Sequence, residues 1–295
     1  MRLDSAQLNA FATVIDEGSF ERAAAVLHVT RSAVSQRVKL LEERVGQVLV
    51  RRATPCTPTE AGQALYRHAR EVALSETDAL ATIGGGQHTS TRLAIGVNAD
   101  SLATWFPHAM AQAAEGQSIT FDIHVEDQDH SANLLREGRV MAAVTADPQP
   151  VQGCKVLPLG TLRYRALASP TFMQRHFAQG VNATTLAQAP MLVFNRKDAL
   201  QARFVGRITR RKLTPPVHWL PEANAFVMAT RAGLGWGMTP DPMVQHDLEA
   251  GTLVELLPGK PVDVPLYWQS WRLNVQALHH MTEAVQRAAG LTLLR

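Results

Sequence analysis

The stretch SFERAAAVLHVTRSAVSQRVKLLEERVG, residues Ser19–Gly46, decides the fold of the N-terminal part of this chain. It predicts two helices joined by a tight turn. Ser19 and Thr30 are suited to begin these helices, because their hydroxyl oxygens can accept hydrogen bonds from otherwise unpaired backbone N–H groups. Gly46 is suited to end the second helix, since glycine readily adopts the left-handed conformation found just past a helix C-terminus.

The second helix has one apolar face and one polar face. Its apolar stripe consists of residues spaced by three and four positions, namely Val34, Val38, Leu41 and Val45. Its polar face mixes short hydrogen-bonding side chains with long cations: Arg31, Ser32, Ser35, Gln36, Arg37 and Lys39. Short polar groups can approach base edges, and cations can contact phosphate. This face predicts the DNA-reading helix of a helix-turn-helix, and an ordinary solvated surface helix is the alternative interpretation.

The residues after this helix predict a short two-stranded wing, formed by Val48–Arg52 and Pro55–Thr57. Arg51 and Arg52 would lie at its tip and suit a narrow minor groove or a phosphate, whereas a solvated turn is the alternative. The chain as a whole carries a net charge of only +3 over 295 residues. Six Lys and Arg residues nevertheless lie between positions 31 and 52, against two glutamates. This concentration of positive charge on the proposed reading helix predicts duplex DNA as a partner.

A long helix follows the wing and is expected to connect two domains. Thr57 is suited to cap it, Pro58 to occupy its first position, and Glu60 to reach back to the cap. The helix should run to about Ile83 and end at the glycines 84–86. Three of its residues repeat every seven positions and predict a dimer seam, namely Leu65, Val72 and Ala79. A two-fold dimer would present two reading helices to two half-sites.

The C-terminal part alternates predicted strands with predicted helices, which indicates a parallel α/β sheet. We expect a DNA-binding domain at residues 1–57, a linker helix and hinge at residues 58–90, and an effector-binding domain at residues 91–295. The last of these should form two lobes with a cleft between them. Lobe 1 would contain residues 91–160 and 268–295, and lobe 2 residues 161–267.

Ligands of such sheets bind beyond the carboxyl ends of the strands, near helix N-termini. Polar side chains gather in the corresponding loops of this sequence. The candidate ligand contacts are Asn98, Asp100, Ser101, Trp105, Gln128, Thr145, Asp147, Asn195, Asp198 and Glu222. A zwitterionic amino acid would suit this set, because its carboxylate can bind helix N–H groups and hydroxyls while its ammonium binds Asp or Glu. Helix capping by the Asp and Asn residues, and core packing by Trp105, are the alternative interpretations.

The N-terminal stretch resembles the helix-turn-helix of the LysR-type transcriptional regulators, whose pattern is SF-x-x-AA-x-x-L followed by S-x-(V/L)-S-x-x-(I/V)-x-x-LE-x-x-(L/V)-G. Blocks in the C-terminal part resemble the regulators of basic amino acid export within that family, some of them once described as inhibitors of chromosome initiation. These blocks are VNADSLATWF, EDQDH, VTADPQPVQGC, GTLRYRALASPTF, VFNRKDALQ, GLGWGM and VPLYWQSWRL. The resemblance extends over essentially the whole chain.

The resemblance implies a winged helix-turn-helix domain, a linker helix and a two-lobed domain like that of periplasmic binding proteins. It also implies homodimers, often assembled as dimers of dimers, that bind a promoter upstream of an exporter gene. The implied effector is lysine, arginine or a related basic amino acid, with no other cofactor. Whether the effector recruits or blocks RNA polymerase is left open, as is the direction of the transcriptional response.

Composition excludes several other classes of protein. The two cysteines, Cys56 and Cys154, are isolated, which argues for a reducing compartment and against a disulfide scaffold or a zinc site. No signal peptide or membrane span is evident, so we expect a cytoplasmic protein. Gly233, Gly235 and Gly237 form a glycine pattern, but it ends a helix where a dinucleotide fingerprint would begin one. An enzyme is therefore disfavoured, whereas an architectural or replication-inhibiting DNA binder without ligand control remains the alternative function.

Overall fold

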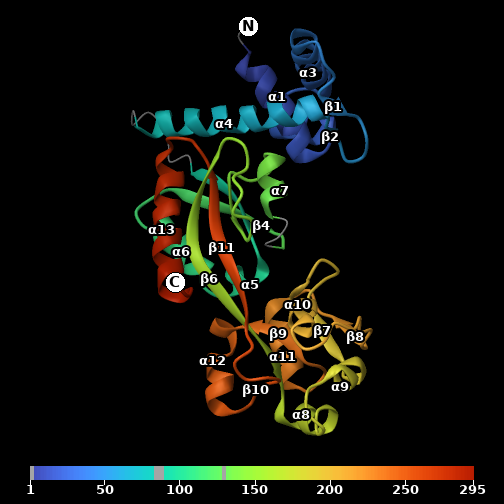
Figure 1. Ribbon diagram of the computed structural model, residues 1–295. Helices are drawn as coiled ribbons and strands as arrows, with labels where there is room; N and C mark the ends of the chain where they lie inside the picture. Colours follow the sequence, from blue (N-terminus) through green and yellow to red (C-terminus); the bar gives the residue numbers. More distant parts are fainter. Residues whose placement is uncertain (1–2, 83–89, 128–130) are drawn as a thin grey trace.

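The computed structural model describes residues 3–82, 90–127 and 131–295. A helical head occupies one end, a long helix lies across its base, and two α/β lobes follow one below the other (Figure 1). The head contains α1 (Ser5–Glu17), α2 (Phe20–Val26), α3 (Arg31–Val45) and a two-stranded antiparallel wing of β1 (Val50–Arg51) and β2 (Thr57–Pro58). This arrangement confirms the winged helix-turn-helix expected from the sequence.

The head is built by local signals around a small core. Asp4 caps α1 by accepting from the Gln7 N–H at 2.9 Å, and Gly18 ends that helix with a φ of 64°. Phe11 of α1 packs with the apolar stripe of α3, in which Val34, Val38 and Leu41 are fully buried and Val45 is partly buried. The stripe of α3 therefore holds the helix against α1 and leaves its opposite face to solvent.

Helix α4 (Glu60–Thr82) joins the head to the first lobe. The predicted cap at Thr57 is wrong, because Thr57 belongs to β2 and the hydroxyl of Thr59 accepts the Gly62 N–H at 3.0 Å. Along α4, Tyr66 packs in the core of the head, whereas Leu74 packs in the core of the lobes. The expected helix end at Ile83 and the hinge up to residue 89 lie outside the described residues.

Lobe 1 contains a sheet covered by helices. Its strands are β3 (Thr91–Val97), β4 (Ile119–Val125) and β5 (Ala142–Thr145), and its helices are α5 (Ala99–Ala103), α6 (Phe106–Ala114), α7 (Ser131–Arg136) and the C-terminal α13 (Gln276–Thr292). Strand β3 pairs in parallel with β4 and β5, but β11 joins β5 antiparallel. The strand pairs β3–β4 and β3–β5 are thus parallel, as the sequence indicated, and β11 makes the sheet mixed.

Two long antiparallel strands run through both lobes, β6 (Cys154–Ala168) and β11 (Val262–Trp271) (Figure 1). Their register shifts between Leu266 and Tyr267, opposite Gly160. Gly160 has a φ of 132°, and a side chain there would lie 2.7 Å from the carbonyl oxygen of Leu294, so only glycine fits. The irregularity falls at the lobe boundaries expected from the sequence, which themselves stay a prediction.

Lobe 2 consists of short elements around β6. They are α8 (Pro170–His176), α9 (Ala183–Gln188), β7 (Met191–Val193), α10 (Leu200–Gly206), β8 (Val217–Trp219), α11 (Ala223–Arg231), β9 (Gly237–Pro240), α12 (Asp241–Ala250) and β10 (Val254–Glu255). Strands β9 and β10 pair with β6, whereas β7 and β8 form a separate parallel pair. Within the described part of the chain, no helix is both long enough and apolar enough to cross a membrane.

Candidate functional site

Helix α3 is positioned as a reading helix. The Thr30 hydroxyl accepts the Ala33 N–H at 3.2 Å at its start, and Gly46 ends it with a φ of 76°. Arg31, Ser32, Gln36 and Lys39 are exposed along the face that the core leaves free, and Ser35 and Arg37 are half-buried beside them. The polar face predicted from the sequence is therefore presented to solvent, and its contact with bases stays a prediction.

Two cations of this face are held by weak ion pairs. Arg31 contacts Glu21 at 2.9 Å, and Lys39 contacts Glu43 at 3.6 Å. All four side chains are more than half exposed. Exposed pairs of this kind contribute about 0–1 kcal/mol. A DNA phosphate can therefore replace either carboxylate at little cost.

The wing is tied to the helix-turn-helix by side chains on both sides. The Arg52 guanidinium lies 5.1 Å from the centroid of the Phe20 ring, at the start of α2. A carboxylate oxygen of Glu42, on α3, accepts the N–H groups of Leu49 and Val50 at 2.8 and 3.3 Å. Arg51 remains exposed on β1. The positions of Arg51 and Arg52 relative to α3 are thus fixed, and the sequence alone gave no sign of the part that Glu42 plays.

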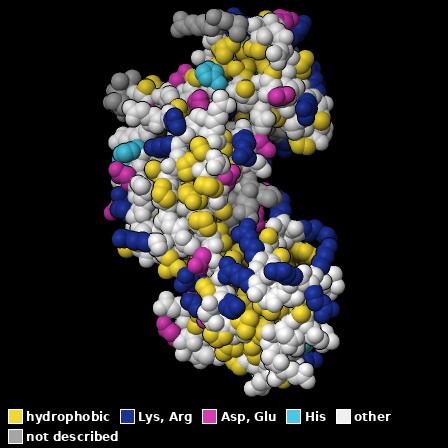
Figure 2. All heavy atoms as spheres, viewed as in Figure 1, with side chains coloured by type: hydrophobic (Ala, Val, Ile, Leu, Met, Phe, Trp, Pro, Cys, Tyr) yellow, Lys and Arg dark blue, Asp and Glu magenta, His cyan; other side chains and the backbone are white. Residues whose placement is uncertain are grey.

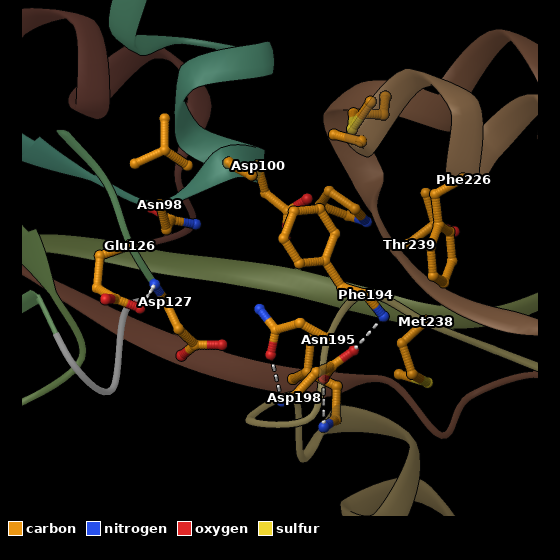
Figure 3. A pocket seen from close by; sticks show the side chains of 16 residues that line it. Asn98, Asp100, Glu126, Asp127, Phe194, Asn195, Asp198, Phe226, Met238 and Thr239 are labelled. Carbon is orange, nitrogen blue, oxygen red and sulfur yellow. Dashed lines mark hydrogen bonds between the residues drawn. The ribbon is translucent and has the colours of Figure 1, made fainter. Parts of the chain in front are cut away.

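A cavity of about 110 Å³ lies between the two lobes (Figure 3). Lobe 1 contributes Asn98 and Asp100 from the start of α5 and Glu126 and Asp127 from the loop after β4, and lobe 2 faces them with Phe194, Asn195, Asp198, Phe226, Met238 and Thr239. Four of these side chains are carboxylates. None of the described residues that line the cavity is a lysine or an arginine.

Asp100 is the carboxylate whose ionisation is most altered. Its carboxylate accepts a hydrogen bond of 2.7 Å from the hydroxyl of the buried Tyr164. Burial raises the pKa of Asp100 to about 6, against the opposing effect of the Tyr164 hydrogen bond, and the charges of Asp198 and Asp127 raise the pKa further. A cationic ligand would stabilise the ionised form and reverse this shift.

Asp198 and Glu126 hold the loops on either side of the cavity. Asp198 accepts the N–H groups of Phe194 at 3.1 Å and Leu200 at 2.9 Å, so it fixes the start of α10. Glu126 accepts the Asp127 N–H at 3.0 Å with one of its carboxylate oxygens. Both carboxylates therefore combine a structural hydrogen bond with a position on the cavity wall.

Two buried polar side chains on the cavity wall have no hydrogen-bond partner among the residues that the structure describes. They are Asn98 of lobe 1, through both atoms of its amide, and Thr239 of lobe 2, through its hydroxyl. Asn98 is 2% exposed and Thr239 1%. Leaving a buried polar group unpaired costs about 1–3 kcal/mol, so a ligand that hydrogen-bonds to both would recover this energy. Carboxylate oxygens can accept from both an amide and a hydroxyl.

The structure brings only part of the predicted ligand set together. Asn98, Asp100, Asn195 and Asp198 line the cavity, and their contact with a ligand stays a prediction. Gln128 lies outside the described residues. The remaining candidates have other places in the fold, and none of them is among the residues that line this cavity.

Glu222 and Asp147 serve local structure. Glu222 caps α11 by accepting the N–H groups of Asn224 at 3.0 Å and Ala225 at 2.6 Å. Asp147 lies beyond β5, where it accepts the Gln149 N–H at 2.9 Å and pairs with Arg136 at 3.8 Å. Glu222 is thus a helix cap, whereas Asp147 makes its contacts in the loop between β5 and β6, where no helix begins.

Three further candidates are buried in lobe 1. Thr145 is fully buried at the end of β5, where its hydroxyl accepts the Asp147 N–H at 3.1 Å. Ser101 is fully buried on α5, and within the described part of the chain its hydroxyl has no hydrogen-bond partner. Trp105 is 1% exposed and contacts the edge of Phe106 with ring centroids 5.5 Å apart. Trp105 therefore packs in the core of lobe 1.

Sequence reasoning missed several residues of the cavity wall. Glu126 and Phe194 directly follow β4 and β7, so the rule that ligands lie beyond strand ends could have found both. Met238 and Thr239 lie within β9, which pairs antiparallel with β6, and that rule does not reach them. Phe226 lies on α11, whose position depends on tertiary packing.

Two family models match this chain. One, described as bacterial regulatory helix-turn-helix protein, lysR family, matches residues 5–63, and the other, described as LysR substrate binding domain, matches residues 86–291. The chain belongs to the LysR family of transcriptional regulators. Among LysR-family relatives, the HTH-type transcriptional regulator LysG of Mycobacterium tuberculosis is 48% identical over 98% of this chain and 94% of its own length.

Solved structures of LysR-family proteins agree with this assignment. The crystal structure of ArgP from Mycobacterium tuberculosis has a TM-score of 0.89 and 47% identity, and covers 100% of this chain and 99% of that one. Full-length LysG from Corynebacterium glutamicum with bound effector Arg has a TM-score of 0.82 and 40% identity, and covers 99% and 100%. The two-domain LysR architecture expected from the sequence is thus confirmed.

Proposed function

We propose that this LysR-family regulator senses a basic amino acid, arginine or lysine, in the cavity between its lobes, and controls a basic amino acid exporter gene from a promoter in the cytoplasm. The observation that carries the proposal is the cavity wall, where four carboxylates from two lobes converge without a lining lysine or arginine. LysG of Corynebacterium glutamicum, named for lysine export and solved with Arg, supports it. We assign no catalytic role to any residue in this function.

The charges of the ligand match those of the wall. A basic amino acid carries two cationic groups and one carboxylate at neutral pH. Its cationic groups can pair with the carboxylates of Asp100, Glu126, Asp127 and Asp198, and its carboxylate can accept from Asn98 and Thr239. A neutral amino acid would leave part of this negative charge uncompensated in a partly desolvated space, which disfavours its binding.

Many cations of lobe 2 lie on its outer surface. Residues 196–212 contain seven exposed cations; Lys197 reaches the edge of the cavity, where it pairs with Glu126, and the others are Arg196, Arg203, Arg207, Arg210, Arg211 and Lys212. Figure 2 shows Lys and Arg side chains gathered over the part of lobe 2 where Figure 1 places α10 and β8. The lobe therefore separates an outer basic surface from an acidic cavity, which supports selection of a cation by the cavity.

We propose that α4 brings two chains together, because its C-terminal half exposes apolar side chains. Val72 is half-buried, Ala79 is exposed, and Leu80 is 53% exposed. A two-fold dimer would place two copies of α3 in successive major grooves, about 34 Å apart. A dimer of dimers, and contact with RNA polymerase, are further parts of the proposal that rest on the family.

Titration calorimetry with L-arginine, L-lysine and the uncharged arginine analogue L-citrulline tests the sensor. We expect the two basic amino acids to bind and citrulline to bind much more weakly, because the side chain of citrulline has the length of the arginine side chain but no positive charge. Equal binding of citrulline would show that the carboxylates do not select charge. Promoter footprints that are the same with and without arginine would favour an architectural DNA binder.

A further inference from the structure

One lysine of the protein already occupies a carboxylate of the cavity. The ammonium of Lys197, in the loop after β7 of lobe 2, donates to Oε1 of Glu126, in the loop after β4 of lobe 1, at 2.9 Å. The side chains are 46% and 29% exposed. Glu126 lines the cavity, whereas Lys197 does not. This ion pair therefore joins the two lobes at the edge of the cavity.

The loop that carries Lys197 is held in place from within. The side-chain oxygen of Asn195 accepts the backbone N–H groups of Lys197 at 2.7 Å and Asp198 at 3.1 Å. Figure 3 shows Asn195 and Asp198 on the side of the cavity opposite Glu126 and Asp127. The backbone of the loop is thus fixed, so the position of the Lys197 ammonium is set by its own flexible side chain.

We infer that Lys197 is an internal competitor of the effector, and that it determines which cations the cavity accepts. Its ammonium neutralises Glu126 in the absence of ligand, and the cationic group of the effector replaces it on binding. This inference rests on the proposed function, because it requires a cationic ligand. Lys197 thereby influences specificity without contacting the ligand.

The chemistry of the pair favours a guanidinium over an ammonium as the displacing group. Lys197 binds a single oxygen of Glu126 through one hydrogen bond. A guanidinium can bind both carboxylate oxygens with two parallel hydrogen bonds, so exchange of Lys197 for arginine gains an interaction. Exchange of Lys197 for free lysine replaces one ammonium by another, so it gains no interaction. Arginine should therefore bind more tightly than lysine.

The variant Lys197→Met tests the competition, since it keeps most of the aliphatic length and removes the charge. The half-exposed ion pair between Lys197 and Glu126 contributes little free energy, so its loss should change arginine binding only modestly. We expect the Kd of arginine to fall about three- to fivefold. The Kd of citrulline should change by less than about twofold, because a neutral ligand does not need to displace Lys197. Lys197→Gln, which keeps a polar side chain, should behave in the same way.

The neighbouring Arg196 provides a matched control. Arg196 lies in the same loop and is exposed, but its guanidinium stacks 5.5 Å from the centroid of the Trp219 ring. Arg196→Met removes the same charge and should change the Kd of arginine by less than about twofold. An equal gain in Arg196→Met would reduce the effect to net charge and overturn the inference.

The remaining outcomes separate this inference from the proposed function. Weaker arginine binding in both Lys197 variants would show that the pair acts as a latch that holds the lobes together, and would overturn the competition. Unchanged binding in both, with normal thermal unfolding, would also overturn it while leaving the sensor intact. Wild-type protein that binds neither arginine nor lysine would overturn the proposed function itself.

Discussion

The affinity for arginine should depend on pH in a way set by Asp100. Burial raises the pKa of this carboxyl to about 6, and the neighbouring charges of Asp127 and Asp198 add to the effect, whereas the Tyr164 hydroxyl opposes it. Because a carboxyl is ionised above its pKa, Asp100 is charged at neutral pH and protonated in mild acid. A cationic ligand binds the ionised form of Asp100. The affinity for arginine should therefore be greatest above about pH 7 and should fall as the pH drops through 6.

The size of the effect follows from this pKa. One pH unit below the pKa of Asp100, about one tenth of the molecules carry its charge, so the Kd of arginine should rise roughly tenfold between about pH 7.5 and about pH 5. At a pH equal to the pKa, binding should release about half a proton, because the ligand draws Asp100 into its ionised form. Calorimetry in two buffers of different ionisation enthalpy measures both quantities.

Two variants decide whether Asp100 is responsible. Asp100→Asn should bind arginine more weakly at neutral pH and lose most of the pH dependence in this range, since it can no longer ionise. Glu249→Gln removes an exposed carboxylate from α12 and should keep the wild-type profile. A Kd that stays constant from neutral pH to about pH 5, or an unchanged profile in Asp100→Asn, would refute the reasoning.

Four further variants test other parts of the molecule. Gln36→Ala should cost about 1–3 kcal/mol of discrimination between the operator and base-substituted sites in competition binding. Arg51→Ala should weaken binding to all duplexes and lower the slope of affinity against salt by about 1, whereas an unchanged slope would remove the wing from the interface. Glu222→Ala should lower the free energy of unfolding by about 0.5–2 kcal/mol through loss of the α11 cap, and leave calorimetric arginine binding unchanged. Arg67→Ala should lower that free energy, measured by urea unfolding, by about 1–3 kcal/mol, because the Arg67 guanidinium of α4 donates to the Gln152 carbonyl at 2.6 Å and lies 5.4 Å from the Trp271 ring centroid in lobe 1.

The parts of the fold that the sequence predicted well are those with local causes. Helix α3 begins at Thr30 and ends at Gly46 because a hydroxyl cap and a left-handed glycine act within a few residues. The sequence predicts a single helix over residues 102–114, whereas the structure ends α5 at Ala103 and begins α6 at Phe106, next to Pro107. The interruption between the two helices could therefore have been predicted from the sequence, since proline favours the first turn of a helix.

The long strands β6 and β11 were the main feature that the sequence could not supply. Their partners lie about a hundred positions apart in the chain, as in Tyr164 with Val262. Apolar residues alternate with others in part of each strand, at residues 162–166 and 262–266, but this alternation does not indicate which segments pair, and Pro158 and Gly160 interrupt the first strand. Only residues 266–271 of β11 were predicted, and β6 was not, because strand length here comes from tertiary pairing.

The candidate site was predicted in part because capping and ligand contact use the same residues. Asp198 does fix the start of α10 and also lies on the cavity wall, whereas Glu222 caps α11 away from it. Both follow a strand and precede a helix, so no local rule separates them. The distinction depends on which helix N-terminus lies at the cavity, and that is set by tertiary packing.

The geometry of the cavity explains why a ligand there can alter the arrangement of the whole chain. A ligand shifts an equilibrium only by its difference in affinity between two states. Asp100 and Asp198 belong to different lobes, so a cation that contacts both binds better when the lobes are close. In lobe 1, β11 ends at Trp271, whose ring centroid lies 5.4 Å from the Arg67 guanidinium of α4, and β6 begins at Cys154. We therefore expect a ligand that changes the lobe separation to affect, through these two strands, the helix that carries the DNA-binding head.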